Sequence, residues 1–335
     1  MSGTALKRTV AALATAMLIT SACGGAAGPG GGAGTFSLSR PVEFVISTSP
    51  GGGSDTYARF MQGVIEKESL TSQPVQPVNK EGGSGAVAFN YVFEKKGDPH
   101  VIFITLNSFF LTMATQDLPY QATDFTPIAN LALDPFFLWV NNDSPWQTAQ
   151  DFIKAAQAEE LAVIGTGSKQ EDEVLFRTIQ KAHNTKPFRY VPESGGGAVA
   201  AALAGKQGGV VATVNNPSEG LPLYTGGSPK VRPICAFLPE SPTEGTFKDL
   251  PTCQSQGMEV EPYFNTRAIM APPDLTEAQQ AFWVDVFRKV SESQEWKDFV
   301  ATNNLNPDFK SGAEFATLIA DLDQVHRDIA DEQGW

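Results

Sequence analysis

Histidine, cysteine and basic residues are all scarce in this 335-residue chain. It contains three His and three Cys, which leaves little material for a metal centre, and we expect neither a metal nor a cofactor. The 24 Lys and Arg are outnumbered by 37 Asp and Glu, so that the net charge is −13. We therefore expect no nucleic-acid partner, because proteins that bind nucleic acids neutralise phosphates with Lys and Arg.

Long apolar runs are also missing. No run reaches the length of about 20 apolar residues that a membrane-spanning helix needs. The apolar run at residues 10–19 is shorter and follows Lys7 and Arg8, a pattern typical of a signal peptide. Residues 20–23 (TSAC) resemble a bacterial lipobox, which predicts cleavage after residue 22 and acylation of Cys23. The alternative is an ordinary cleaved signal peptide. Residues 23–38, rich in Gly and Ala, are predicted to be a flexible tether to the outer face of the cell membrane.

The two remaining cysteines, Cys235 and Cys253, are 18 positions apart, which matches no common metal-binding spacing. Outside the cytoplasm such a pair can persist as a disulfide. We expect this bridge, with two buried free thiols as the alternative.

Strand and helix patterns alternate along the rest of the chain, and 41% hydrophobic residues suffice for packed cores. Strands are predicted at residues 42–47, 75–78, 101–106, 136–140, 161–164, 188–191, 209–214, 231–237 and 263–270. Helices are predicted at residues 56–67, 148–158 and 171–183. Two more are predicted to end at residues 93 and 204, and two terminal helices to follow from residue 276 onward. This alternation predicts an α/β fold with parallel sheets.

Three glycine-containing loops join a strand to the helix that follows it, at the edge of an α/β sheet where ligands bind. Helix starts offer free N–H groups to anions, and glycine lets a ligand approach the backbone. A structural turn is the alternative for any one loop. The predicted ligand-binding residues of these loops are Ser49, Pro50, Gly51, Gly52, Gly53, Ser54, Gly165, Thr166, Gly167, Ser168, Ser194, Gly195 and Gly196.

Four further residues complete the predicted site. Asp55 is expected to organise the first loop from the start of its helix. Asn107 and Ser108, which follow a buried strand, and Asn215 are expected to contribute polar side chains. By contrast, the acidic residues 171–173 are interpreted as a solvated helix start favoured by the helix dipole.

A series of short motifs occurs in an order that resembles a known receptor family. The motifs are VEFVISTSPGGGSDTYAR (residues 42–59), VNKEGGSG (78–85), GDPH (97–100), YQATDFTPI (120–128), RYVPESGG (189–196) and DLPT (249–252). They are similar to the corresponding segments of the tripartite tricarboxylate transporter receptors, the Bug or TctC-like solute-binding proteins. Glu193 and Ser194 depart from the family pattern, and an acidic Glu193 near the cleft would disfavour a second ligand carboxylate or select a ligand that carries an amine.

The resemblance implies a type II periplasmic-binding-protein fold, in which two α/β domains joined by two crossing strands enclose a ligand cleft. The domains would comprise residues 39–139 plus 264–335 and residues 140–263. The implied function is capture of a small organic anion, a carboxylate, by a monomer that delivers it to membrane permease subunits.

Two other functions stay open at this point: an exported α/β enzyme acting on a carboxylated metabolite, and a sensor component that presents its ligand. Against catalysis, the chain lacks the G-x-S-x-G elbow of serine hydrolases. Two G-x-G-x-x-A matches, at residues 83–88 and 195–200, lack a clear acidic residue about 20 positions on, which dinucleotide binding requires. We therefore expect a binding protein and no enzyme.

Overall fold

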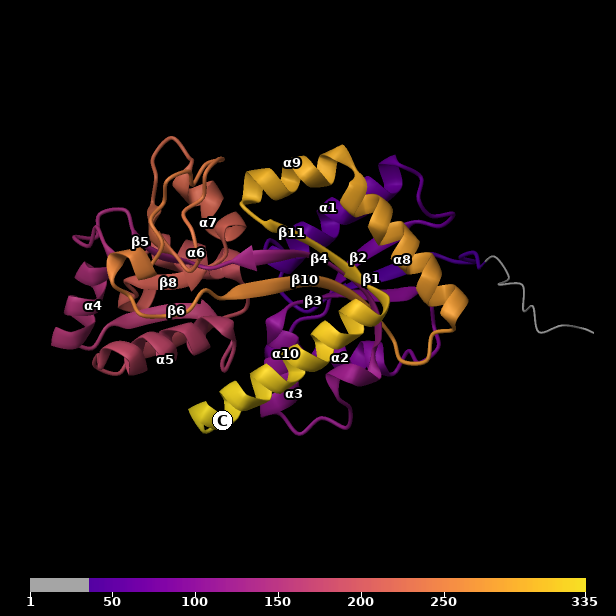
Figure 1. Ribbon diagram of the computed structural model, residues 1–335, viewed down its shortest axis with the longest axis horizontal. Helices are drawn as coiled ribbons and strands as arrows, with labels where there is room; N and C mark the ends of the chain where they lie inside the picture. Colours follow the sequence, from indigo (N-terminus) through magenta and orange to yellow (C-terminus); the bar gives the residue numbers. More distant parts are fainter. Residues whose placement is uncertain (1–35) are drawn as a thin grey trace, which may run out of the picture. The chain divides into compact units, whose positions relative to one another are not determined.

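Two mixed β-sheets, each covered by helices on both faces, organise the protein in the computed structural model (Figure 1). The structure describes residues 36–335, so the predicted signal peptide, Cys23 and most of the predicted tether lie outside the described residues. Among the helices of residues 36–335, none combines the length and apolar character needed to cross a membrane.

The first sheet has the strand order β11-β4-β10-β3-β1-β2. Its strands are β1 (Val42–Ile46), β2 (Val75–Asn79), β3 (Val101–Thr105), β4 (Thr126–Pro135), β10 (Phe264–Ala271) and β11 (Asn306–Ser311). On one face pack α1 (Gly53–Lys67), α8 (Glu277–Glu292) and α9 (Gln294–Asn303), with Phe44 and Trp283 in the core between them. On the other face pack α2 (Ala86–Phe93), α3 (Asn107–Thr115) and α10 (Gly312–Gln333), around Phe103 and Phe110.

The second sheet has the strand order β7-β6-β8-β5-β9. Its strands are β5 (Phe137–Asn141), β6 (Ala162–Thr166), β7 (Arg189–Glu193), β8 (Ala212–Asn215) and β9 (Val231–Ala236). One face is covered by α4 (Ala149–Ala158) and α5 (Glu171–His183), the other by α6 (Gly196–Ala204) and α7 (Pro217–Tyr224). A disulfide joins Cys235 on β9 to Cys253, with a Cα–Cα distance of 4.9 Å.

The chain crosses between the sheets twice. It leaves the first sheet at the end of β4 and enters the second at β5, with Phe136 between them. It returns through Tyr263 into β10, whose Phe264 pairs with Pro135. The expected division between residues 139 and 140 falls within β5, whose residues 137–141 pair in the second sheet.

The prediction of parallel sheets is wrong in part. β1 is parallel to β2 and β3, and β6 is parallel to β7 and β8. However, β10 runs antiparallel to β3 and β4, and β5 runs antiparallel to β8 and β9. The reason is topological, because a strand that enters or leaves a sheet by crossing is not a βαβ repeat and need not follow its direction.

The sequence interpretation also missed several elements of the first sheet. Strand β4, helix α3 and the edge strand β11 were not predicted, and three helices rather than two follow residue 276. Helix α3 begins at Asn107, immediately after β3, so Asn107 and Ser108 lie in the first turn of a helix that was not predicted.

Candidate functional site

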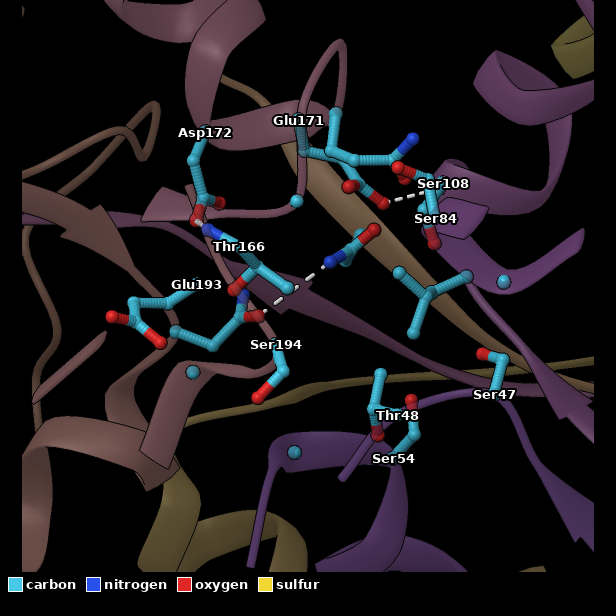
Figure 2. Close-up of a pocket in the computed structure, with 18 of the residues that line it drawn as sticks. Ser47, Thr48, Ser54, Ser84, Ser108, Thr166, Glu171, Asp172, Glu193 and Ser194 are labelled. Atoms are coloured by element: carbon cyan, nitrogen blue, oxygen red, sulfur yellow. Dashed lines mark hydrogen bonds between the residues drawn. The ribbon is translucent and has the colours of Figure 1, made fainter. Parts of the chain in front are cut away.

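A polar cavity of ≈ 210 Å³ lies where the loops of the first sheet face the loops and helix starts of the second (Figure 2). The two walls differ in chemistry. On the side of the first sheet the polar side chains are mainly hydroxyls, which we call the hydroxyl wall: Ser47, Thr48, Ser54, Ser84 and Ser108. On the side of the second sheet four carboxyl groups form the carboxyl wall: Glu171, Asp172, Glu193 and Glu219.

The first loop connects β1 to α1 and is organised from within. Gly51 has a φ of +82°, a conformation that favours glycine, and its N–H donates to Asp55 Oδ2 at 2.9 Å. Asp55 also accepts hydrogen bonds from Asn79 and Arg59. Asp55 therefore has the organising role expected of it and does not line the cavity, whereas Gly53 and Ser54 do.

The loops of the two sheets touch one another directly. Ser49 Oγ donates to the carbonyl of Ser194 at 3.4 Å, and Ser84 Oγ donates to the carbonyl of Ser168 at 3.2 Å. At Gly197 an added Cβ would lie 2.6 Å from the carbonyl oxygen of Gly51, so only glycine allows this approach. These contacts close the cavity at its edges.

Carboxyl groups of the chain itself accept hydrogen bonds from N–H groups of the loops around the cavity. Gly53 N donates to Glu219 Oε1 at 2.8 Å, and Ser108 N donates to Glu171 Oε1. Thr166 N donates to Asp172 Oδ2 at 2.5 Å. Two of these bonds join one sheet's unit to the other's, because Glu219 and Glu171 belong to α7 and α5.

The interpretation of residues 171–173 as a solvated helix start is therefore wrong. Glu171 and Asp172 are each 3% exposed, and both line the cavity. Helix α5 begins inside the interface between the sheets, so its first turn faces protein and the cavity instead of bulk water. The helix dipole explains why acidic residues stand at the start of α5. It does not indicate whether that helix start is buried or exposed to solvent.

Burial changes the protonation of these carboxyl groups. It raises the pKa of Glu171 to about 7, against the hydrogen bond from Ser108, and raises the pKa of Glu219 to about 7, against the nearby Arg267. The pKa of Asp172 is raised well above its ordinary value, mainly by burial and further by the charges of Glu171 and Glu219. An ionised carboxylate in this wall is costly unless a cation accompanies it.

Arg267 on β10 is the one cation among the described residues that line the cavity, and it already has an acidic partner. Its Nε and Nη2 donate to Asp134 Oδ2 at 2.9 and 2.6 Å, and Nη2 also donates to Asn216 Oδ1 at 3.0 Å. Tyr57 donates to the same carboxylate. Burial opposes the guanidinium charge, but Asp134 holds the pKa of Arg267 above its ordinary value.

Several polar atoms at the cavity have no partner among the described residues. They include the hydroxyl oxygens of Thr48 and Ser54 and the amide oxygen Oε1 of Gln170. Ser54 is 1% exposed and Gln170 is 2% exposed. The Gln170 Nε2 group donates to the carbonyls of Ser168 and Lys169, so Oε1 is the free acceptor. Buried polar groups in this state are suited to a bound polar molecule.

The predicted site residues divide into two groups. Those that line the cavity are Gly53, Ser54, Ser108, Thr166, Gly167, Ser194, Gly196 and Asn215. Those that the cavity does not reach are Ser49, Pro50, Gly51, Gly52, Asp55, Asn107, Gly165, Ser168 and Gly195. Asn107 uses its side chain to hold the return crossing, since Nδ2 donates to the Phe264 carbonyl and Oδ1 accepts from Thr266.

Sequence reasoning singled out Glu193 but missed the other charged groups of the site. Glu219 and Arg267 stand in segments without a glycine loop, and only the packing of the two sheets brings them to Gly53. A signal did exist for Glu171 and Asp172, because they begin the helix that follows one of the three loops. No group of three His, Cys, Asp or Glu within residues 36–335 is arranged to hold a metal ion.

Comparison with known proteins gives one family match and similar folds. Residues 58–334 match the model of the tripartite tricarboxylate transporter family receptor, TctC. A UPF0065 protein from the gbd 5′ region of Cupriavidus necator is 23% identical over 301 residues, covering 88% of both chains.

Two solved structures are similar at lower identity. The periplasmic binding protein BugD has a TM-score of 0.80 at 17% identity, covering 89% of this chain and 98% of that one. MatC from Rhodopseudomonas palustris with bound malate has a TM-score of 0.76 at 20% identity, covering 87% and 98%. The α/β fold with two sheets and two crossing strands is thus that of the periplasmic binding proteins, as expected.

Proposed function

Since the chain belongs to the tripartite tricarboxylate transporter receptor family, we propose that it captures a small carboxylate-containing solute and passes it to membrane permease subunits. The observation that carries this proposal is the cavity itself. Both sheets contribute to its walls, and its edges are closed by loop contacts that separate when the sheets move apart. A solute bound there is held by both units and is released when they open.

The sheets would move as two units joined at the crossings β4–β5 and Tyr263–β10. We assign residues 36–135 and 264–335 to the first unit and residues 137–263 to the second, following the strand pairing. This hinge proposal is supported by the hydrogen bonds between the two units around the cavity, which are single bonds from side chains or helix starts rather than a continuous strand ladder.

The solute's carboxylate would face the hydroxyl wall. Ser54 stands in the first turn of α1, where the helix dipole favours an anion, and its Oγ has no partner among residues 36–335. Thr48 Oγ1 lies at the same wall and is likewise without a partner there. Malate in the similar MatC structure supports a carboxylate as the ligand class.

Binding is tested by thermal shift and calorimetry of the purified protein with mono-, di- and tricarboxylates and amino acids. We expect a saturable rise in Tm with at least one of these carboxylates, and recovery of that compound unchanged by mass spectrometry. Conversion of the compound would favour the alternative of an exported enzyme. To separate uptake from sensing, a deletion strain is grown on the bound compound as the only carbon source, and lost growth supports uptake.

The location of the protein is proposed from the sequence alone. Residues 1–22 would direct export, and a lipid on Cys23 would anchor the chain to the outer face of the cell membrane as a monomer. The test compares wild type with Cys23→Ser in membrane and soluble fractions of the producing cells. We expect the variant to leave the membrane fraction, and an unchanged distribution would exclude the anchor.

A further inference from the structure

The carboxyl wall has more negative groups than the site has positive ones. The guanidinium of Arg267 is already paired with Asp134, since it donates two hydrogen bonds to one oxygen of that carboxylate. On the side of the second sheet, Glu171, Asp172, Glu193 and Glu219 then face the cavity with Arg267 as the one cation among the described lining residues. Glu81 adds a further carboxyl at the exposed edge of the first sheet. A ligand with two or three carboxylates would bring like charges together here.

The buried polar atoms of the two walls can form hydrogen bonds with different kinds of ligand group. Gln170 Oε1, next to the carboxyl wall, is an acceptor without a donor among residues 36–335, and an amide oxygen cannot bind an anion. Ser54 Oγ, at the hydroxyl wall, can donate to an anion. Figure 2 shows Glu171 and Asp172 on the opposite side of the cavity from Ser54 and Thr48. Buried acceptors therefore outnumber cations in the cavity: Glu171 lies beside Ser108 and Glu219 beside Gly53, and the hydroxyls without a partner among residues 36–335 are those of Thr48 and Ser54.

We propose that the ligand is an amino acid or a similar zwitterion, with its ammonium group at Glu171, Glu219 and Gln170 and its carboxylate at Thr48 and Ser54. This assignment rests on the proposed function and names the ligand class of the same cavity. An ammonium group has donors and no acceptor, so it matches carboxylates and the Gln170 oxygen together. The high pKa values of Glu171 and Glu219 agree with a site that is completed by a bound cation.

The first experiment compares compounds of matched length by calorimetry at pH 7. The probes are 5-aminopentanoate, glutarate, pentanoate and cadaverine, together with the α-amino acids alanine, glutamine and lysine. We expect one or more amino-carboxylates to bind at least tenfold more tightly than both glutarate and pentanoate. Calcium chloride is included to test whether a simple cation is sufficient.

Each outcome has a separate meaning. Glutarate or pentanoate binding as tightly as the amino-carboxylates would overturn the zwitterion assignment and leave the proposed receptor function in place. Binding of cadaverine or calcium without any amino-carboxylate would overturn both the zwitterion and the carboxylate receptor. If no probe binds, the zwitterion assignment is overturned, and the receptor function is decided by the wider screen of mono-, di- and tricarboxylates.

The second experiment removes single charges while preserving shape. In Glu171→Gln and Glu219→Gln, the amide oxygen can still accept from Ser108 N or Gly53 N. We expect each variant to bind the best amino-carboxylate at least tenfold more weakly, with little change for pentanoate. Glu68→Gln, an exposed position at the end of α1, is the matched control. Equal losses for pentanoate, with Tm of the free variants unchanged, would show that the two carboxyls do not act on the ammonium.

Discussion

At the scale of residues, the carboxyl wall shows how a helix start can serve a purpose opposite to the expected one. The N–H group of Gly53 was expected to face a ligand anion and instead donates to Glu219, while Ser108, expected to contribute its side chain, donates its N–H to Glu171. Their hydrogen bonds fix one oxygen of each carboxyl group. The wall is thereby preorganised at the cost of burying acidic groups.

The raised pKa values predict how the stability of the unliganded protein changes with pH. Glu171 and Glu219 have a pKa of about 7 in the folded protein and an ordinary value of 4.5 when unfolded. The folded state therefore binds more protons between these values, and stability falls as pH rises from 4.5 to 7. Each group can account for up to about 3 kcal/mol of this loss.

Urea unfolding at pH 5, 6, 7 and 7.5 measures this slope. The Glu171→Gln/Glu219→Gln double variant should show a flatter dependence than wild type, because its amides do not titrate. Glu68→Gln should keep the wild-type slope. An unchanged slope in the double variant would show that neither glutamate is responsible.

The Arg267–Asp134 pair predicts a second residue-scale effect. Arg267 is 2% exposed and Asp134 is fully buried, so Asp134→Ala leaves an unpaired buried guanidinium. We expect a loss of about 3–5 kcal/mol in the free energy of unfolding. The Asp134→Ala/Arg267→Met double variant should recover part of that loss, since it removes both charges. A cost for Asp134→Ala below about 1 kcal/mol would contradict this account of the pair.

At the scale of elements, the loops carry the closing contacts and the helices position the charged groups. Loop 49–54 packs against loop 194–197, while the starts of α5 and α7 bring Glu171 and Glu219 to the cavity. The glycine loops could be predicted from strand-and-helix alternation. Their main contact partner, the opposite loop, could not, because the two are about 145 positions apart in the chain.

Gly197→Ala tests the loop contact. The added Cβ would lie 2.6 Å from the Gly51 carbonyl across the cavity edge, so closure is impeded while each sheet keeps its own core. We expect a smaller rise in Tm with the best amino-carboxylate and little change in the Tm of the free protein. Circular dichroism checks that the α6 helix is retained.

Gly63→Ala is the matched control, because nothing lies within 4 Å of its added Cβ in the middle of α1. Alanine there should raise the stability by about 0.5–1 kcal/mol and leave ligand-induced stabilisation unchanged. If both variants respond equally to the compound, the contact between Gly197 and Gly51 has no role in binding.

At the scale of the whole molecule, the two crossings divide the chain into units that share few covalent links. Figure 1 shows β4 and β10 running side by side from the first sheet toward the second, and β10 pairs along β4. Asn216 reinforces this junction by donating to the Pro135 carbonyl and accepting from Arg267. In the proposed hinge movement, these hydrogen bonds at the crossings would persist, and the contacts between the loops would separate.

Small-angle X-ray scattering tests this movement. We expect the radius of gyration to decrease when the best-binding compound of the matched series is added at saturation, because hinge closure brings the units together. Gly197→Ala should show a smaller decrease. An equal radius with and without that compound, for a protein that binds it by calorimetry, would exclude closure.

The sequence by itself determined the α/β class, the helix over residues 171–183, the positions of the three glycine loops and the family resemblance. These follow from local periodicity, turn residues and motif order, which need no knowledge of distant contacts. Tertiary structure alone decided the direction of the crossing strands and the composition of the carboxyl wall. Glu171, Glu219 and Arg267 meet at one cavity only because the loops and helix starts of the two sheets face each other, and charge burial depends on that packing rather than on neighbours in the chain.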